Sequence, residues 1–204
     1  MMDNNYWNEK YAPTEFIYTK IENRFVVEFC EDLKGKTAID LAGGEGRNSV
    51  WLAKLGWRVE NIDFSKVALN KYLDYAREEG VENNCSSNCA DALTFVPASS
   101  PVDLALIGYL QIPQQALASA IQRLASHVSA GGHLFGVWHS RENLNGGFGG
   151  PRDPEVLPSI ETIQEALEPT GLKIQVLENR EGQIQTKEGL KPSVTLVLLA
   201  SRPE

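Results

Sequence analysis

Cysteine is scarce in this chain of 204 residues, and the cysteines present fit neither a disulfide framework nor a metal site. Only Cys30, Cys85 and Cys89 occur, at irregular spacing. A small disulfide-stabilised protein needs an even set of regularly spaced cysteines. Cys85 and Cys89 lie four apart, but no second Cys/His pair completes a zinc site, so we expect no metal. We interpret all three as ordinary thiols in a reducing compartment and expect a cytoplasmic protein.

Long apolar runs, blocks of like charge and internal repeats are also missing. No apolar run reaches the ~18 residues of a membrane-spanning helix, and the opening MMDNNYWNEKYAP contains no apolar signal core. The formal net charge of −8 repels phosphate backbones and anionic lipid headgroups. We therefore expect partners other than nucleic acid or membranes, namely a small molecule or a protein.

Short apolar runs alternate regularly with amphipathic stretches along the chain. A hydrophobic share of 42% suffices for one core, and the length suits one α/β domain. Periodicity predicts strands over residues 37–41, 57–62, 86–90, 102–107, 133–138, 172–177 and 194–200. It predicts helices over residues 47–55, 65–79, 114–128 and 159–168.

This alternation predicts an α/β fold with a seven-stranded, mostly parallel sheet and helices on both faces. The last two strands differ, because residues 178–193 between them are polar and lack a helical period. A parallel crossover normally needs a covering helix, so these strands are predicted to form an antiparallel hairpin. We expect one domain, 1–204, in which 1–36 form an N-terminal helical cap segment and 37–204 form the core.

The most informative segment is the glycine-rich Asp40–Asn48, DLAGGEGRN, which follows a predicted strand and opens a predicted helix. Gly44 and Gly46 allow positive φ and close approach of a ligand to the backbone. The helix N-terminus offers free N–H groups suited to a carboxylate. Asp63 ends the next strand, 19 residues after Gly44, where a carboxylate can accept both hydroxyls of a ribose. Together these features predict a nucleoside-binding site.

Two cofactors compete for this geometry. Gly44-x-Gly46-x-x-Ser49 is a near match to the dinucleotide fingerprint of NAD proteins, with Ser49 in place of the third glycine. Asp40, however, places a carboxylate just before the turn, where a pyrophosphate gains nothing and an amino group does. S-adenosylmethionine carries an amino group, a carboxylate, a ribose and a sulfonium, and no phosphate. The acid therefore favours S-adenosylmethionine, with NAD as the alternative.

At these residues the sequence resembles the class I S-adenosylmethionine-dependent methyltransferases, over nearly its whole length. Asp40–Gly46 is similar to their first motif, with Ala42 in place of the first glycine. IDFS at 62–65 resembles the second motif, whose acid binds ribose. Ala90-Asp91-Ala92 resembles the third motif, whose acid would accept the adenine amino group. The closing hairpin matches the family's sheet.

A narrower resemblance rests on the N-terminal YWNEKYA, the GGEGRN of the turn, His139 and the glycine-rich loop at 146–151. These segments look like the small bacterial branch labelled tellurite-resistance or thiopurine-type. The family resemblance implies a Rossmann-like methyltransferase fold, S-adenosyl-L-methionine as cofactor and S-adenosyl-L-homocysteine as product. The cofactor-binding residues it implies are Asp40, Ala42, Gly43, Gly44, Gly46, Asn48, Asp63, Phe64, Asp91, Ala92 and Tyr109.

Tyr109 and His139 are the candidate catalytic residues, because they end two strands at the edge where open α/β sheets bind ligands. His139 is a candidate base or substrate donor, the alternative being a hydrogen-bonded structural histidine. Tyr109 either lines the site or packs beside it. The leaving group is good, so the protein mainly aligns the reactants, and a base is needed only if the acceptor loses a proton.

Four further residues are candidate substrate contacts. Tyr11 and Tyr18 precede the first strand and form either an aromatic lid over the cofactor or the packing of an N-terminal helix. Arg47 and Arg152 either steer an anionic acceptor or pair with nearby acids. The loop at 146–151 is either a mobile active-site loop or a plain connection.

These residues predict an S-adenosylmethionine-dependent methyltransferase that acts on a small molecule. No separate substrate-recognition domain is visible, so the acceptor must fit under the N-terminal segment and the loop at 140–155. The alternatives are an NAD-dependent oxidoreductase and a non-catalytic module that binds S-adenosylmethionine. We expect a monomer or a homodimer.

Overall fold

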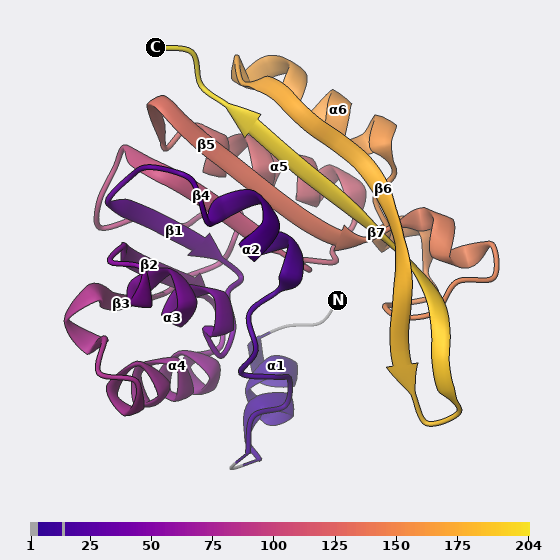
Figure 1. The fold of residues 1–204 in the computed structure, drawn as a ribbon, viewed down its shortest axis with the longest axis horizontal. Coiled ribbons are helices and arrows are strands. Elements are labelled where there is room, and N and C mark those ends of the chain that lie inside the picture. The colour runs from indigo at the N-terminus through magenta and orange to yellow at the C-terminus, as the bar shows by residue number, and fades with distance from the viewer. Residues whose placement is uncertain (1–3, 14) are drawn as a thin grey trace.

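The computed structural model describes residues 4–13 and 15–204. Residues 1–3 and 14, which belong to the predicted cap segment, lie outside the described residues. Strands are arranged in one sheet in the order β3-β2-β1-β4-β5-β7-β6 (Figure 1). Their bounds are β1 (Thr37–Leu41), β2 (Arg58–Asp63), β3 (Cys85–Cys89), β4 (Val102–Gly108), β5 (Val128–His139), β6 (Lys173–Thr186) and β7 (Gly189–Ser201). Strands β1 to β5 pair in parallel, and β7 is antiparallel to β5 and β6. The predicted fold class is confirmed.

Helices lie on both faces of the sheet. Their bounds are α1 (Asn4–Tyr11), α2 (Arg24–Cys30), α3 (Arg47–Lys54), α4 (Lys66–Glu78), α5 (Gln114–Ala125) and α6 (Ile160–Leu167). Helices α5 and α6 pack on one face, whereas α2 and α3 pack on the other and α4 packs beside α3. In the described part of the chain, no helix has the length and apolar character needed to cross a membrane.

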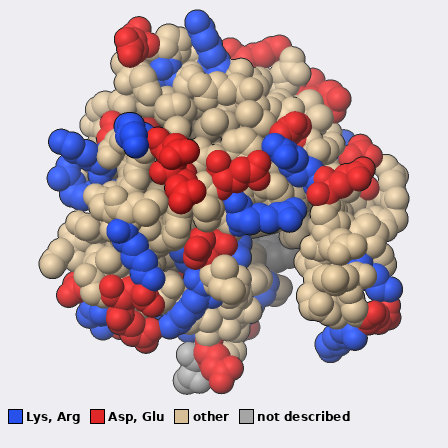
Figure 2. Space-filling model, in the orientation of Figure 1, with Lys and Arg blue, Asp and Glu red and all other residues tan. Residues whose placement is uncertain are grey.

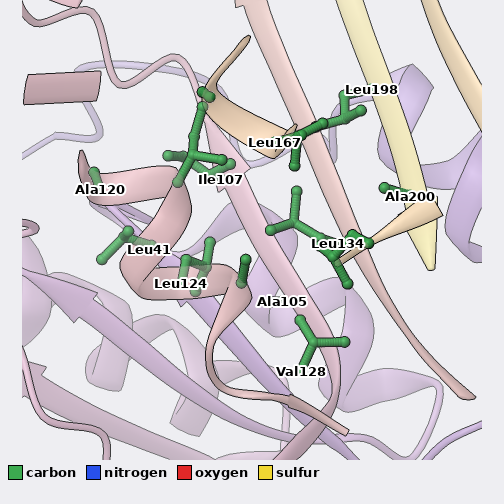
Figure 3. Packing of buried hydrophobic residues seen from close by; sticks show 14 of the residues in the cluster. Leu41, Ala105, Ile107, Ala120, Leu124, Val128, Leu134, Leu167, Leu198 and Ala200 are labelled. Atoms are coloured by element: carbon green, nitrogen blue, oxygen red, sulfur yellow. The ribbon is translucent and has the colours of Figure 1, made fainter. Parts of the chain in front are cut away.

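The central strand β4 is apolar on both sides because both faces of the sheet are covered. Ala105 and Ile107 face α5, while Leu104 and Leu106 pack toward α2 and α3. Figure 3 shows the α5 side, where Leu134 of β5 lies among the side chains of β4, α5 and β7. This packing on both faces explains why residues 102–107 are continuously apolar. Because the neighbouring strands β1 and β5 run parallel to β4, their carboxyl ends lie at the same edge of the sheet.

Two regions differ most from the prediction, the junction of α5 with β5 and the terminal hairpin. Helix α5 ends at Ala125, and β5 begins at Val128, five residues early, because Val128 pairs with Val102 at the start of β4. The terminal hairpin is far longer than predicted, and its strands are joined by a two-residue turn, Lys187–Glu188. Pairing of β7 with β5 stops at Thr195, so residues 181–194 form a two-stranded arm. Because no third strand extends this part of the hairpin into the packed sheet, its sequence lacks the apolar alternation of a half-buried sheet.

Candidate functional site

The carboxyl ends of four neighbouring strands bring the predicted site residues to one edge of the sheet. Asp63 ends β2, Asp40 lies near the end of β1, Tyr109 follows β4 and His139 ends β5. These strands are adjacent in the order β2-β1-β4-β5 and run in parallel. The four side chains therefore follow one another along the edge, as is typical of ligand sites in open α/β sheets.

The turn after β1 has a left-handed backbone at three positions, with φ of 56° at Ala42, 56° at Gly44 and 82° at Gly46. A Cβ at Gly46 would collide with the ring of Tyr72. At Gly44 it would lie 2.9 Å from the Tyr11 hydroxyl. Both glycines are thus required by backbone conformation and by close packing. Ala42 adopts the left-handed conformation with a side chain, at a cost in free energy.

Asp63 holds this turn against the end of β2. Its Oδ2 accepts the Gly44 N–H at 3.0 Å, and its Oδ1 accepts the Ser65 N–H at 2.8 Å. Burial raises the pKa of Asp63 to about 6, although these backbone hydrogen bonds oppose the shift. Phe64 follows it, half-buried. Asp63 therefore joins the glycine turn and the start of α4 at one carboxylate.

Asp40 is fully buried beneath the turn. Its Oδ2 accepts the Ser49 hydroxyl at 2.7 Å, while its Oδ1 has no hydrogen-bond partner among the residues described. Burial raises the pKa of Asp40 to about 7. A Cβ at Gly43 would lie 2.8 Å from this carboxyl group. A buried acceptor without a donor is costly, so Asp40 suits a ligand that brings a positive charge and N–H donors.

Glu45 is a site residue for which the sequence analysis assigned no role. It lies inside the turn but is only 5% exposed. Its carboxylate accepts the N–H groups of Ile17, at 3.1 Å, and Tyr18, at 3.3 Å, and pairs with Lys71 at 3.1 Å. All these partners lie more than 20 residues away along the chain, so no local pattern reveals them. Glu45 fixes the N-terminal segment to the turn.

Helix α1 covers the glycine turn. Tyr11 is 6% exposed, stacks on Trp7 at 5.7 Å and reaches Gly44 with its hydroxyl. Asn8 Oδ1 accepts the Ser65 hydroxyl at 2.8 Å, which fixes α1 to the start of α4. Tyr18 packs edge-on to Tyr11 but is 51% exposed. Of these two tyrosines, only Tyr11 therefore lies over the turn.

The segment that follows β3 carries Asp91 and Ala92. Asp91 is exposed, and its Oδ1 accepts the Leu93 N–H at 2.7 Å. Ala92 packs against the main core cluster. The Ala90 N–H donates to the carbonyl of Asp63 at 3.2 Å, so this segment adjoins the end of β2.

Tyr109 lies between the glycine turn and His139 along this edge of the sheet. It is a non-glycine residue with φ of 55°, and such backbone strain clusters at functional sites. Its ring lies 4.8 Å from the ring of His139, and the Arg47 guanidinium lies 5.8 Å from the Tyr109 ring. Asn23 Nδ2 donates to the Tyr109 hydroxyl at 3.1 Å, and the Asn23 N–H donates to Asn48 Oδ1 at 2.9 Å. The side-chain oxygen of Asn48 thus positions Asn23.

His139 is held between Tyr109 and the glycine-rich loop. Its N–H donates to Gln111 Oε1 at 3.1 Å, and a Cβ at Gly150 would lie 2.6 Å from its imidazole. Burial lowers the pKa of His139, so its imidazole is neutral at pH 7. Its Nδ1 is buried and has no hydrogen-bond partner in the described part of the chain. The loop can approach the ring this closely only where it has no side chain.

Arg47 and Arg152 have different surroundings. Arg152 is exposed, donates to the Asn143 carbonyl at 3.0 Å and lies 5.7 Å from the Phe148 ring. It therefore braces the loop, whereas Arg47 lies beside Tyr109. Neither has a carboxylate within 4.0 Å among residues 4–13 and 15–204.

Comparisons with known proteins show which fold and which domain family this chain resembles. Residues 38–132 match the family model described as a methyltransferase domain. TehB from Haemophilus influenzae has a similar fold, with a TM-score of 0.72 and 17% identity over 98% of this chain and 66% of that one. An S-adenosylmethionine-dependent methyltransferase from Clostridium acetobutylicum gives a TM-score of 0.68 and 16% identity over 98% of both chains. An S-adenosylmethionine-dependent methyltransferase from Methanosarcina mazei gives a TM-score of 0.68 and 15% identity over 90% of this chain and all of the other. A comparison with curated proteins gave no match.

The central part of the chain thus matches a methyltransferase domain, and the fold is that of the S-adenosylmethionine-dependent methyltransferases compared above. The matched segment runs from β1 to the first residues of β5 and includes the glycine turn. The protein is a methyltransferase enzyme whose cofactor is S-adenosyl-L-methionine, as the sequence analysis expected.

The left-handed backbone at Ala42 leads to a stability prediction. Ala42→Gly removes the strain of a side chain at φ 56° and should raise the free energy of unfolding by about 1 kcal/mol. Ala118→Gly, within α5, should lower it by about 1 kcal/mol. Urea unfolding measures the free energy of unfolding of both variants. A destabilised Ala42→Gly variant would contradict the inference that the backbone at Ala42 is strained.

The contacts of Glu45 lead to a second prediction. Glu45→Gln removes the charge that binds Lys71 and two backbone N–H groups, so trypsin should cleave after Lys10 and Lys20 severalfold faster. Glu60→Gln is the matched control, because Glu60 is also buried and accepts a distant backbone N–H, that of Ala98. Equal cleavage rates in the two variants would show that Glu45 does not hold the segment.

Proposed function

We propose that this methyltransferase acts on a small-molecule acceptor bound beside Tyr109 and His139. The observation that carries this proposal is the contact of the Tyr109 and His139 rings, 4.8 Å apart, at the ends of β4 and β5, of which β4 lies next to β1 and its glycine turn. Helix α1 and the glycine-rich loop flank this edge, which favours a compact acceptor over a macromolecule.

The buried groups of the turn fit S-adenosylmethionine. We assign the amino group of the cofactor to the partnerless oxygen of Asp40, since an ammonium supplies both the donors and the charge that the carboxyl group lacks. Its carboxylate fits the free N–H groups at the start of α3. Gly43, Gly44 and Gly46 permit the close approach, and Ala42 is the residue that begins the turn.

The nucleoside half of the cofactor fits the ends of β2 and β3. Each oxygen of Asp63 accepts one backbone N–H and keeps a lone pair for a ribose hydroxyl. Phe64 and Ala92 offer apolar surface for the adenine, and Asp91 offers an acceptor for its amino group. Tyr11 closes over the ribose side, because it already covers the turn.

The acceptor side fits transfer by alignment. When bound, the cofactor supplies an electrophilic methyl group on a good leaving group, so the residues of the chain mainly orient the acceptor. Tyr109 and Arg47 provide a surface on which the acceptor lies. His139 is neutral, so its imidazole can accept a proton from an acceptor hydroxyl, thiol or amine.

Label transfer tests the proposal directly. The protein is incubated with S-adenosylmethionine labelled in its methyl group and a bacterial lysate, which is then separated into small molecules, nucleic acid and protein. We expect label among the small molecules, strongly reduced with His139→Gln. Label confined to nucleic acid or protein would contradict the proposal.

The raised pKa values of Asp40 and Asp63 predict pH-dependent cofactor affinity. Both groups are protonated at acidic pH, because their pKa values are about 7 and about 6, and both must ionise to bind a cationic ligand. The affinity for S-adenosylmethionine should therefore rise about tenfold or more from pH 5.5 to 7.5. Calorimetric titration measures this rise, which Asp40→Asn should flatten. Equal wild-type affinity across this range would contradict the assignment.

A further inference from the structure

The arm, residues 181–194, has one partly buried face. Along β6, Gly182, Ile184 and Thr186 are partly buried, whereas Gln183 and Gln185 between them are exposed. Figure 1 shows the arm extending beyond the sheet, and Figure 2 shows a hollow between it and the N-terminal segment. The alternation indicates that one face of the arm is turned toward the protein.

On this face the arm contacts the glycine-rich loop. The Phe148 N–H donates to the Pro192 carbonyl at 2.8 Å. A Cβ at Gly149 would lie 3.2 Å from Ile184 Cδ1, 3.2 Å from His139 Cε1 and 3.4 Å from His139 Nδ1. The Ile184 methyl group and the Nδ1 edge of the imidazole thus both border the position that a side chain at residue 149 would occupy.

The arm also contacts helix α2. A Cβ at Gly182 would lie 2.6 Å from Arg24 Nη2. Arg180, just before the arm, pairs with Glu28 of α2 at 3.3 Å. Helix α2 in turn adjoins Tyr109, since its N-cap residue Asn23 donates to the Tyr109 hydroxyl. The arm therefore links the segments that lie on either side of the Tyr109–His139 pair.

We propose that Ile184 determines acceptor specificity by closing the Nδ1 side of His139 and so limiting the acceptor to a compact molecule with a proton-bearing heteroatom. This inference rests on the proposed function. An apolar side chain at a site boundary excludes longer substrates sterically, and removing three carbons opens space for them. The residue lies outside the matched methyltransferase segment 38–132, on the part of the chain that no sequence pattern connected with the site.

Chemical modification tests the closure without cofactor or acceptor. Diethyl pyrocarbonate attacks neutral imidazoles, and the chain has three histidines, His127, His133 and His139, which mass spectrometry distinguishes. Ile184→Ala should raise the modification rate of His139 severalfold relative to His133. Leu190→Ala is the matched control, because Leu190 lies on the same arm but is 61% exposed, and it should leave the ratio unchanged.

The outcomes separate this inference from the proposed function. Equal His139 rates in the wild type, Ile184→Ala and Leu190→Ala would overturn the closure, whatever the label-transfer assay gives. The His139 modification rate of Ile184→Val should fall between those of the wild type and Ile184→Ala. This milder variant keeps the test valid if Ile184→Ala misfolds. In label transfer, Ile184→Ala should add labelled products of larger mass at unchanged affinity for S-adenosylmethionine. An unchanged set of products would overturn the specificity role.

Discussion

The carboxylate of Asp63 is the interaction on which the rest of the site depends. The turn after β1 needs a left-handed backbone at three alternate positions, 42, 44 and 46, a conformation that the chain does not adopt without support. Asp63 accepts the N–H of Gly44 and that of Ser65, and so fixes the turn and the start of α4 to the end of β2. Because these bonds are buried, they are strong and hold one geometry.

The segments that cover the edge follow from this turn. With the turn in place, Glu45 faces the N-terminal segment and holds it by backbone hydrogen bonds, which brings Tyr11 over Gly44. On the other side, α3 starts at Arg47, next to the Tyr109 ring and thus to His139. One strained turn therefore orders both the cofactor side and the acceptor side of the edge.

The sequence was informative where structure is local and buried. Periodicity located all seven strands, and glycine spacing with Asp63 located the edge where the predicted residues gather. The long-range contacts of Glu45 could not be predicted, because its partners are distant in sequence and its charge suggests an exposed residue. The arm was underestimated because both of its strands are polar, and its stability comes from the turn and from contacts with Gly149 and Arg24. The site assignments themselves stay predictions.

The most direct test of the central claim is calorimetric titration of S-adenosylmethionine into Asp63→Asn and Asp103→Asn. Asp103 is a matched carboxylate, since it accepts the N–H groups of Lys36 and Thr37, far from the glycine turn. If Asp63 holds the turn and binds the ribose, only its variant should lose affinity, by about tenfold to a hundredfold. Equal affinities in the two variants would contradict the account.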